Sequence, residues 1–222
     1  MVGWKGDDTP GKEVLGTKHL VDLLLAPWKD DLKVEDGSPK VSMVFCKMVA
    51  DIPKIDLALV RELKAYVDIH KCPWVTNYAD IGVVHSQDIT LMRDIKGWIT
   101  SPMMQMGLDL QDVVYIILLR PPTDLEDFIQ SWGRGGRMKE DGTTTRVICI
   151  CLFNLEDISE NTTGMTPEVR AFCLESGCLR KALQKVFGGG SLGQVDPEWC
   201  CGPCSGMNCL NPTTTTTTAG QE

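Results

Sequence analysis

The chain has 222 residues, of which 43% are hydrophobic and 23% are charged, as in an ordinary globular protein. Its formal net charge of -8 argues against a uniformly basic surface, so any contact with nucleic acid has to be local. No apolar run approaches the length of a membrane span, and the first residues lack the apolar core of a secretory signal.

Cysteine is the second informative feature of the composition, with ten copies. Without a secretory signal, these residues favour free thiols or a metal site over a framework of disulfides. We therefore expect an intracellular protein whose thiols stay reduced.

Residues 1–12 are polar and rich in glycine, and we expect them to form a flexible lead-in. The stretch from Gly6 to Lys12 imitates a Walker A phosphate loop, but Glu13 stands where a magnesium-binding Ser or Thr belongs and no strand precedes it. We interpret this stretch as a chance match. Apolar residues at helical spacing up to Ala26 then predict an amphipathic helix.

Further along the chain, apolar runs of strand length alternate with helical patterns, which predicts an α/β fold built on a parallel sheet. One helix is expected from Ile55 to Val67. Another is expected from Asp124 to Trp132, preceded by Thr123, which forms a capping box with Glu126. The predicted strands are Val41–Cys46, Val83–His85, Trp98–Thr100, Val113–Leu119 and Val147–Phe153.

The stretch after the second helix is suited to binding phosphate. Gly133 is expected to end the helix, and Gly-Arg-Gly-Gly-Arg then places Arg134 and Arg137 on a loop. The glycines let the backbone turn sharply and approach a ligand closely. Arginine presents a planar, permanently charged fork to phosphate oxygens. We call residues 133–137 the arginine loop.

The pattern Gln130-x-x-Gly133-Arg134-x-x-Arg137 resembles motif VI of superfamily 2 helicases, and its surroundings resemble the RecQ family. In that family an MG(I/L)(D/N) turn, a Val-rich strand, a proline bend and a short helix precede Q-x-x-G-R-A-G-R. The same order runs here from Met106 to Arg137. The resemblance implies that residues 13–154 form a single RecA-like lobe, the C-terminal lobe of such a helicase.

The resemblance also implies roles in ATP hydrolysis. Arg137 would be the arginine finger, Arg134 a second phosphate contact and Gln130 a polar group that couples the nucleotide to the lobe. Gly107 and Asp109 would face the nucleotide, although Asp109 fits a surface turn carboxylate equally well.

Two further residues would lie against DNA. Thr100 matches the threonine that contacts the DNA backbone in motif V, with an ordinary strand-end threonine as the alternative. His85 matches the histidine of a Tyr-His-Ala-Gly segment. In the turn before the long strand, Gln105 replaces a glycine of the family pattern Phe-Gly-Met-Gly.

Residues 166–210 resemble the RecQ zinc-binding subdomain. They contain two expected helices, Pro167 to Glu175 and Leu179 to Phe187. The expected zinc ligands are Cys178, Cys201, Cys204 and Cys209, with Cys200 as the alternative fourth ligand. Cys173 is expected on a helix face, and Cys46, Cys149 and Cys151 in the core of the sheet. Residues 211–222, with six consecutive threonines, are expected to be disordered.

The function implied is ATP-driven 3′ to 5′ unwinding of single-stranded or forked DNA, with structural Zn²⁺. ATP and Mg²⁺ would bind only together with an N-terminal RecA-like lobe, because Walker A and the acidic box do not occur in the sequence. The chain would therefore not be competent alone. The alternative is a non-enzymatic DNA- or protein-binding module held by zinc. Nuclear localisation is expected, or cytoplasmic in a prokaryote, with a role in DNA repair or recombination.

Overall fold

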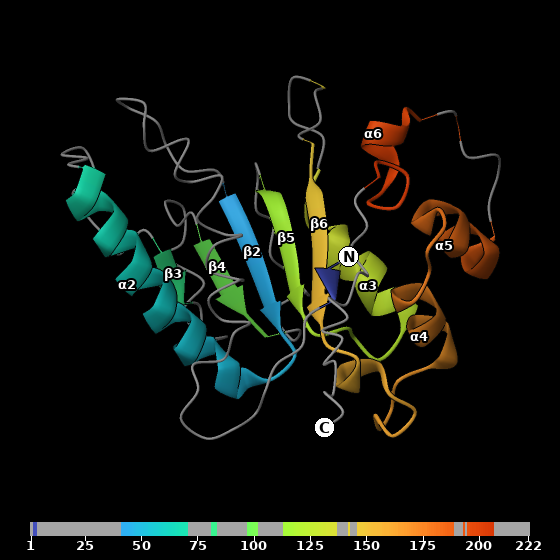
Figure 1. The fold of residues 1–222 in the computed structure, drawn as a ribbon, viewed down its shortest axis with the longest axis horizontal. Helices are drawn as coiled ribbons and strands as arrows, with labels where there is room; N and C mark the ends of the chain where they lie inside the picture. The colour runs from blue at the N-terminus through green and yellow to red at the C-terminus, as the bar shows by residue number, and fades with distance from the viewer. Residues whose placement is uncertain are drawn as a thin grey trace, which may run out of the picture.

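A computed structural model of the chain describes residues 2–3, 41–70, 81–83, 97–101, 113–136, 142, 146–188, 193 and 195–206. Six strands in this part form one sheet in the order β1-β6-β5-β2-β4-β3, and every neighbouring pair is parallel (Figure 1). The strands are β1 Val2–Gly3, β2 Val41–Cys46, β3 Ile81–Val83, β4 Gly97–Thr100, β5 Val113–Leu119 and β6 Ile148–Phe153. The predicted α/β fold with a parallel sheet is confirmed.

The helices lie on both sides of the sheet in Figure 1, with α2 beside β3 and β4, α3 beside β6, and α4, α5 and α6 farther out on the side of α3. They are α2 Ile52–His70, α3 Leu125–Trp132, α4 Pro167–Cys173, α5 Leu179–Phe187 and α6 Pro197–Cys200, with short 3₁₀ helices at Val49–Asp51 and Glu156–Ile158. No helix among the described residues combines the length and apolar character needed to cross a membrane.

The central strands β2 and β5 are apolar apart from the buried Ser42 of β2, because the sheet is covered where they lie. In register, Met43 lies opposite Ile116 and Phe45 opposite Leu118. These side chains form one core with α3 and α4, which contribute Phe128 among others. Burying this apolar surface is the main force that holds the lobe together.

Both central helices differ in detail from the prediction. The helix expected from Ile55 to Val67 is longer, since α2 runs from Ile52 to His70. Its Ile52, Ile55 and Leu59 are buried, whereas Leu57 is 72% exposed. The N-cap of α3 is Asp124, whose Oδ1 accepts a hydrogen bond from the Asp127 backbone N–H at 2.9 Å, so the expected capping box at Thr123 is wrong. Aspartate at this position satisfies one of the orphan N–H groups of the first turn.

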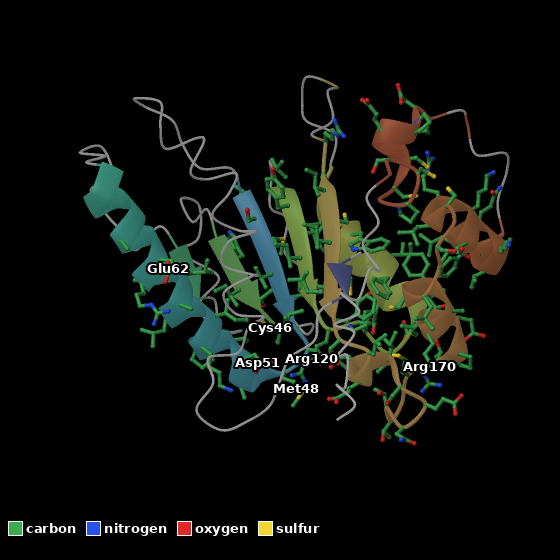
Figure 2. The ribbon with its side chains drawn as sticks, viewed as in Figure 1. Cys46, Met48, Asp51, Glu62, Arg120 and Arg170 are labelled. Atoms are coloured by element: carbon green, nitrogen blue, oxygen red, sulfur yellow. The ribbon has the colours of Figure 1, made fainter. Side chains whose placement is uncertain are left out.

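Two further segments contain regular structure. Val2–Gly3, within the expected lead-in, pair with Leu152 and Phe153 of β6. The polar segment after β6 contains a 3₁₀ helix, and Ile158 and Met165 are buried in it. Arg170 of α4 fixes this segment, because its guanidinium donates to the carbonyl oxygens of Ser159 at 3.0 Å and Glu160 at 3.3 Å. Figure 2 labels Arg170 among the side chains of this region.

The C-terminal ends of β5 and β6 meet at Arg120, which adopts a left-handed backbone conformation with φ 71°. Its N–H donates to Leu152 O at 2.8 Å. Its guanidinium lies 3.9 Å from Asp51 Oδ2 and 3.6 Å from Asp157 Oδ1. Arg120 and Asp51 lie next to each other in Figure 2, at the end of the sheet where α2 begins. Arg120 therefore connects the end of β5 to both 3₁₀ helices, at the C-terminal ends of the strands.

Several predicted features lie outside the described residues. They are the helix ending at Ala26, the Walker A imitation, His85, Gln105, the turn Met106 to Asp109, Arg137, Cys209 and the tail 211–222.

Candidate functional site

The arginine loop begins where α3 ends. Gly133 is the C-cap of α3, and its N–H donates to Ile129 O at 2.8 Å. Two more backbone hydrogen bonds follow. Arg134 N–H donates to Ser131 O at 3.2 Å, and Gly135 N–H donates to Trp132 O at 3.3 Å. The first half of the loop is therefore a continuation of the helix end, and its position depends on α3.

Gly135 and Gly136 are suited to their positions in the loop for different physical reasons. A Cβ atom on Gly135 would lie 2.7 Å and 2.8 Å from the two methyl carbons of Val147 and 3.1 Å from Ile116 Cδ1. No side chain fits there without a shift of its neighbours. Gly136 has φ 66°, a conformation that residues with a Cβ rarely adopt. The loop is thus held against β5 and the start of β6.

The predicted phosphate-binding residues lie around this turn. Arg134 is partly buried, and Gln130 is exposed on α3. Thr100, predicted to contact DNA, is 0% exposed, and its Oγ1 donates to Ser101 O at 3.3 Å. This geometry favours the alternative reading of Thr100 as a strand-end threonine.

The second group of candidate residues is a cluster of cysteines, Cys178, Cys200, Cys201 and Cys204, whose sulfur atoms all lie within 4.8 Å of one another. We call it the cysteine cluster. Cys178 is the N-cap of α5, Cys200 ends α6, and the turn after α6 carries the other two. Of the predicted ligands, the structure brings together Cys178, Cys201 and Cys204, and the alternative ligand Cys200 supplies the fourth sulfur.

The spacing of the cluster fits a metal ion. Four thiolates around zinc at about 2.3 Å in tetrahedral geometry have sulfurs about 3.8 Å apart. Cys178 Sγ and Cys200 Sγ are 3.6 Å apart, which is far longer than a disulfide bond of about 2.05 Å. The four cysteines can therefore bind one metal ion as a set.

The electrostatics of the cluster favour an added cation. Desolvation raises the pKa of Cys178, but hydrogen bonds from the Lys181 backbone N–H and from the thiols of Cys200 and Cys204 lower it to about 7. The pKa of Cys204 is raised to about 12, because its thiol donates hydrogen bonds to Cys201 and Cys178. One thiolate thus hinders the ionisation of its neighbours, and a divalent cation would remove this conflict.

The remaining described cysteines differ from the cluster. Burial raises the pKa of Cys46 and of Cys173 to about 12, and Cys151 is 1% exposed, as expected for thiols that pack in a core. Cys149 is exposed on β6, so the prediction of a core position is wrong for this residue.

Two features of the site were missed from the sequence. One is α6, which orients Cys200. Asp196, whose Oδ1 accepts from Glu198 N–H at 3.1 Å, followed by Pro197 at the first helical position, is a helix start that the sequence contained. The other is the contact of Trp132 with the ring of Phe172 in α4 at a centroid distance of 5.9 Å, which no local pattern indicates.

Comparison with known families agrees with this geometry. Residues 31–139, which include β2 to β5, α3 and the arginine loop, match the family described as "Helicase conserved C-terminal domain". The match covers 109 of the 222 residues, just under half of the chain, and shows a similarity to that family. The matched region is followed by the segment that carries the cysteine cluster.

Among characterised proteins, the chain is 24% identical over 136 residues to the ATP-dependent DNA helicase RecQ of Bacillus subtilis (strain 168). The match covers 54% of this chain and 21% of the relative, so the chain spans about a fifth of that helicase's length. The resemblance to RecQ expected from the sequence is confirmed at this level of identity.

Two solved structures show partial similarity to the chain. The DUF1998 helicase MrfA bound to DNA is similar with a TM-score of 0.48 and 14% identity, over 67% of this chain and 20% of that one. The T. fusca Cas3-ADP structure is similar with a TM-score of 0.44 and 15% identity, over 85% and 22%.

Proposed function

We propose that the chain is the C-terminal half of a RecQ-like, ATP-dependent 3′ to 5′ DNA helicase. The observation that carries this proposal is the arginine loop of the helicase lobe, in which Gly135 is packed against Val147. In this proposal Arg137 is the arginine finger, Arg134 contacts a second phosphate and Gln130 couples the nucleotide to the lobe. Positive charge placed where negative charge develops lowers the barrier to phosphoryl transfer.

We also propose that the cysteine cluster holds a structural zinc ion. Cys178, Cys200, Cys201 and Cys204 would be its ligands, and their mutual spacing and all-sulfur character support this. When bound, zinc would join the start of α5 to the turn after α6 and so close the subdomain. Cys209 would then not be the fourth ligand.

The remaining requirements for activity would come from outside this sequence. ATP and Mg²⁺ would bind between this lobe and an N-terminal RecA-like lobe that carries Walker A and the acidic box, with Asp109 and Gly107 facing the nucleotide. DNA, single-stranded or forked, would be the other partner, contacted by His85 and by the backbone near Thr100. A nuclear location, or cytoplasmic in a prokaryote, follows from this role.

A second candidate function is a non-enzymatic DNA- or protein-binding module that kept the fold and lost the motor. The buried hydroxyl of Thr100 and the net charge of -8 favour it. Retention of Gln130, Arg134 and Arg137 favours the motor.

Reconstitution with a first lobe distinguishes the two functions. Adding a RecQ-type N-terminal lobe in trans should restore ATP turnover that single-stranded DNA stimulates. Arg137→Ala should then lower the rate about a thousandfold or more, with a much smaller change in nucleotide affinity. Arg137→Lys should rescue poorly, since a point charge does not reproduce the planar fork. Equal turnover with Arg137→Ala would make the loop a structural remnant and favour the binding module.

A further inference from the structure

An aromatic triangle joins the helicase lobe to the subdomain with the cysteine cluster. Phe128 and Trp132 of α3 and Phe172 of α4 are its members, with ring centroids 5.0 Å, 5.4 Å and 5.9 Å apart. Phe128 and Phe172 are almost fully buried, and Trp132 packs against the same core. Tilted and edge-on aromatic pairs at such distances are stabilising beyond the area that they bury.

Trp132 is also the last residue of α3 before the arginine loop. Its carbonyl oxygen accepts the hydrogen bond from Gly135 N–H at 3.3 Å, so the turn that carries Arg134 is attached to this residue. On the opposite side, Gly135 rests on Val147 and Ile116. The loop is therefore held between the start of β6 and Trp132, and any displacement of Trp132 moves the backbone of Arg134.

The other side of the triangle leads to the cysteine cluster. Leu179, Ala182 and Leu183 of α5 pack against the core that contains Phe172. Cys178 immediately precedes these residues as the N-cap of α5. A metal ion on Cys178 would thus fix α5, α5 would support α4, and Phe172 would support Trp132.

We propose that Trp132 is a positioning residue through which the cysteine-bearing subdomain sets the placement of the arginine loop. This inference rests on the proposed function for its consequence in catalysis, but the mechanical coupling stands without it. This coupling means that an intact cysteine cluster is needed to position the arginine loop.

Trp132→Phe is the matched control for Trp132→Ala. The indole Nε1–H is buried and has no acceptor among the described residues, so phenylalanine loses no hydrogen bond there. It retains an aromatic ring facing Phe128 and Phe172, whereas alanine removes the contact. If Trp132 only filled space at the end of α3, its substitution would change hydrogen exchange in the arginine loop no more than in the sheet.

Amide hydrogen exchange of the full chain tests the coupling directly, with residues 131–136 as the probe and Val113–Leu119 of β5 as the reference. Trp132→Ala should speed exchange in the probe about tenfold and leave β5 unchanged, and Trp132→Phe should resemble the wild type. Removing bound metal with EDTA should speed the same probe in the wild type and add little in Trp132→Ala.

Unchanged exchange of the probe in Trp132→Ala, or equal acceleration in Trp132→Phe, would overturn the proposal. If Trp132→Ala also speeds exchange in β5, Phe172→Leu is the second test, because it removes the ring contact from the side of α4. It should speed exchange in residues 131–136 and leave β5 unchanged. In the reconstituted pair, Trp132→Ala should lower kcat more than it changes KM for ATP. Coupling by exchange together with a wild-type pair that fails to turn over ATP would refute the proposed function and leave the coupling intact.

Discussion

At the scale of single residues, the arginine loop depends on the absence of a side chain at Gly135. The family pattern has alanine at this position, whereas here both Val147 methyl groups and Ile116 occupy the space that a Cβ would need. The glycine at this position therefore fits the packing beneath it. This makes Gly135 and Val147 a coupled pair.

Gly135→Ala should lower the free energy of unfolding by about 1–3 kcal/mol, the usual cost of overpacking. Adding Val147→Ala should restore part of this loss, so that the double variant is more stable than the sum of the single changes indicates. Urea unfolding of the four proteins measures the coupling. Strict additivity would show that the two sites do not touch in solution.

Arg120 gives a second test at this scale, because its φ of 71° is unfavourable for any residue with a Cβ. Arg120→Ala and Arg120→Gly both remove the ion pairs with Asp51 and Asp157, which are weak at a side chain that is 42% exposed. Only glycine relieves the backbone strain. Arg120→Gly should therefore be about 1 kcal/mol more stable than Arg120→Ala, measured by chemical denaturation. The reverse order would mean that this backbone conformation is not left-handed.

At the scale of elements, the cysteine cluster joins α5 to α6, which are nine and four residues long. The described residues of α5 include none that is fully buried. Helices this short are marginal without tertiary support, so the subdomain needs another source of stability. A metal ion shared between the two helices would supply it, because binding free energy becomes folding free energy.

Cys200→Ser should therefore abolish or greatly weaken binding of one zinc ion per chain, whereas Cys149→Ser should not. Cys149 is the matched control because it is an exposed thiol outside the cluster. Native mass spectrometry gives the metal content, and hydrogen exchange should show α5 loosened in Cys200→Ser with the sheet spared. A folded wild-type chain without metal would contradict the zinc site.

At the scale of the whole molecule, the helicase lobe presents the arginine loop where β6 begins, and Arg120 lies at the edge where β5 and β6 end. In the proposed function, Arg134 and Arg137 would act only on phosphate brought to them by another lobe, since an exposed guanidinium gains little from one anion in water. The lobe alone would then be half of a phosphate site.

The isolated chain should accordingly show neither ATP hydrolysis nor DNA unwinding above background. Phosphate release and strand-displacement assays check this, with Arg137→Ala as the control for contaminating ATPases. Turnover by the isolated wild-type chain that disappears in Arg137→Ala would contradict it.

The sequence by itself determined the parallel sheet, both ends of β5, both ends of α5 and the place of the arginine loop. These features depend on local causes, namely apolar runs, glycine stops and the period of hydrophobic residues. The sequence also predicted cysteines 178, 201 and 204 as one site, because their surroundings resemble a known subdomain.

Only the tertiary structure decided which residues meet across the chain. The ring of Phe172 against Trp132, the space under Gly135 filled by Val147, and the fourth sulfur from Cys200 all depend on distances between segments far apart in sequence. The same holds for Arg120, whose partners Asp51 and Asp157 come from two different 3₁₀ helices. Packing fixes such contacts, and no local propensity encodes them because each partner alone is compatible with many neighbours.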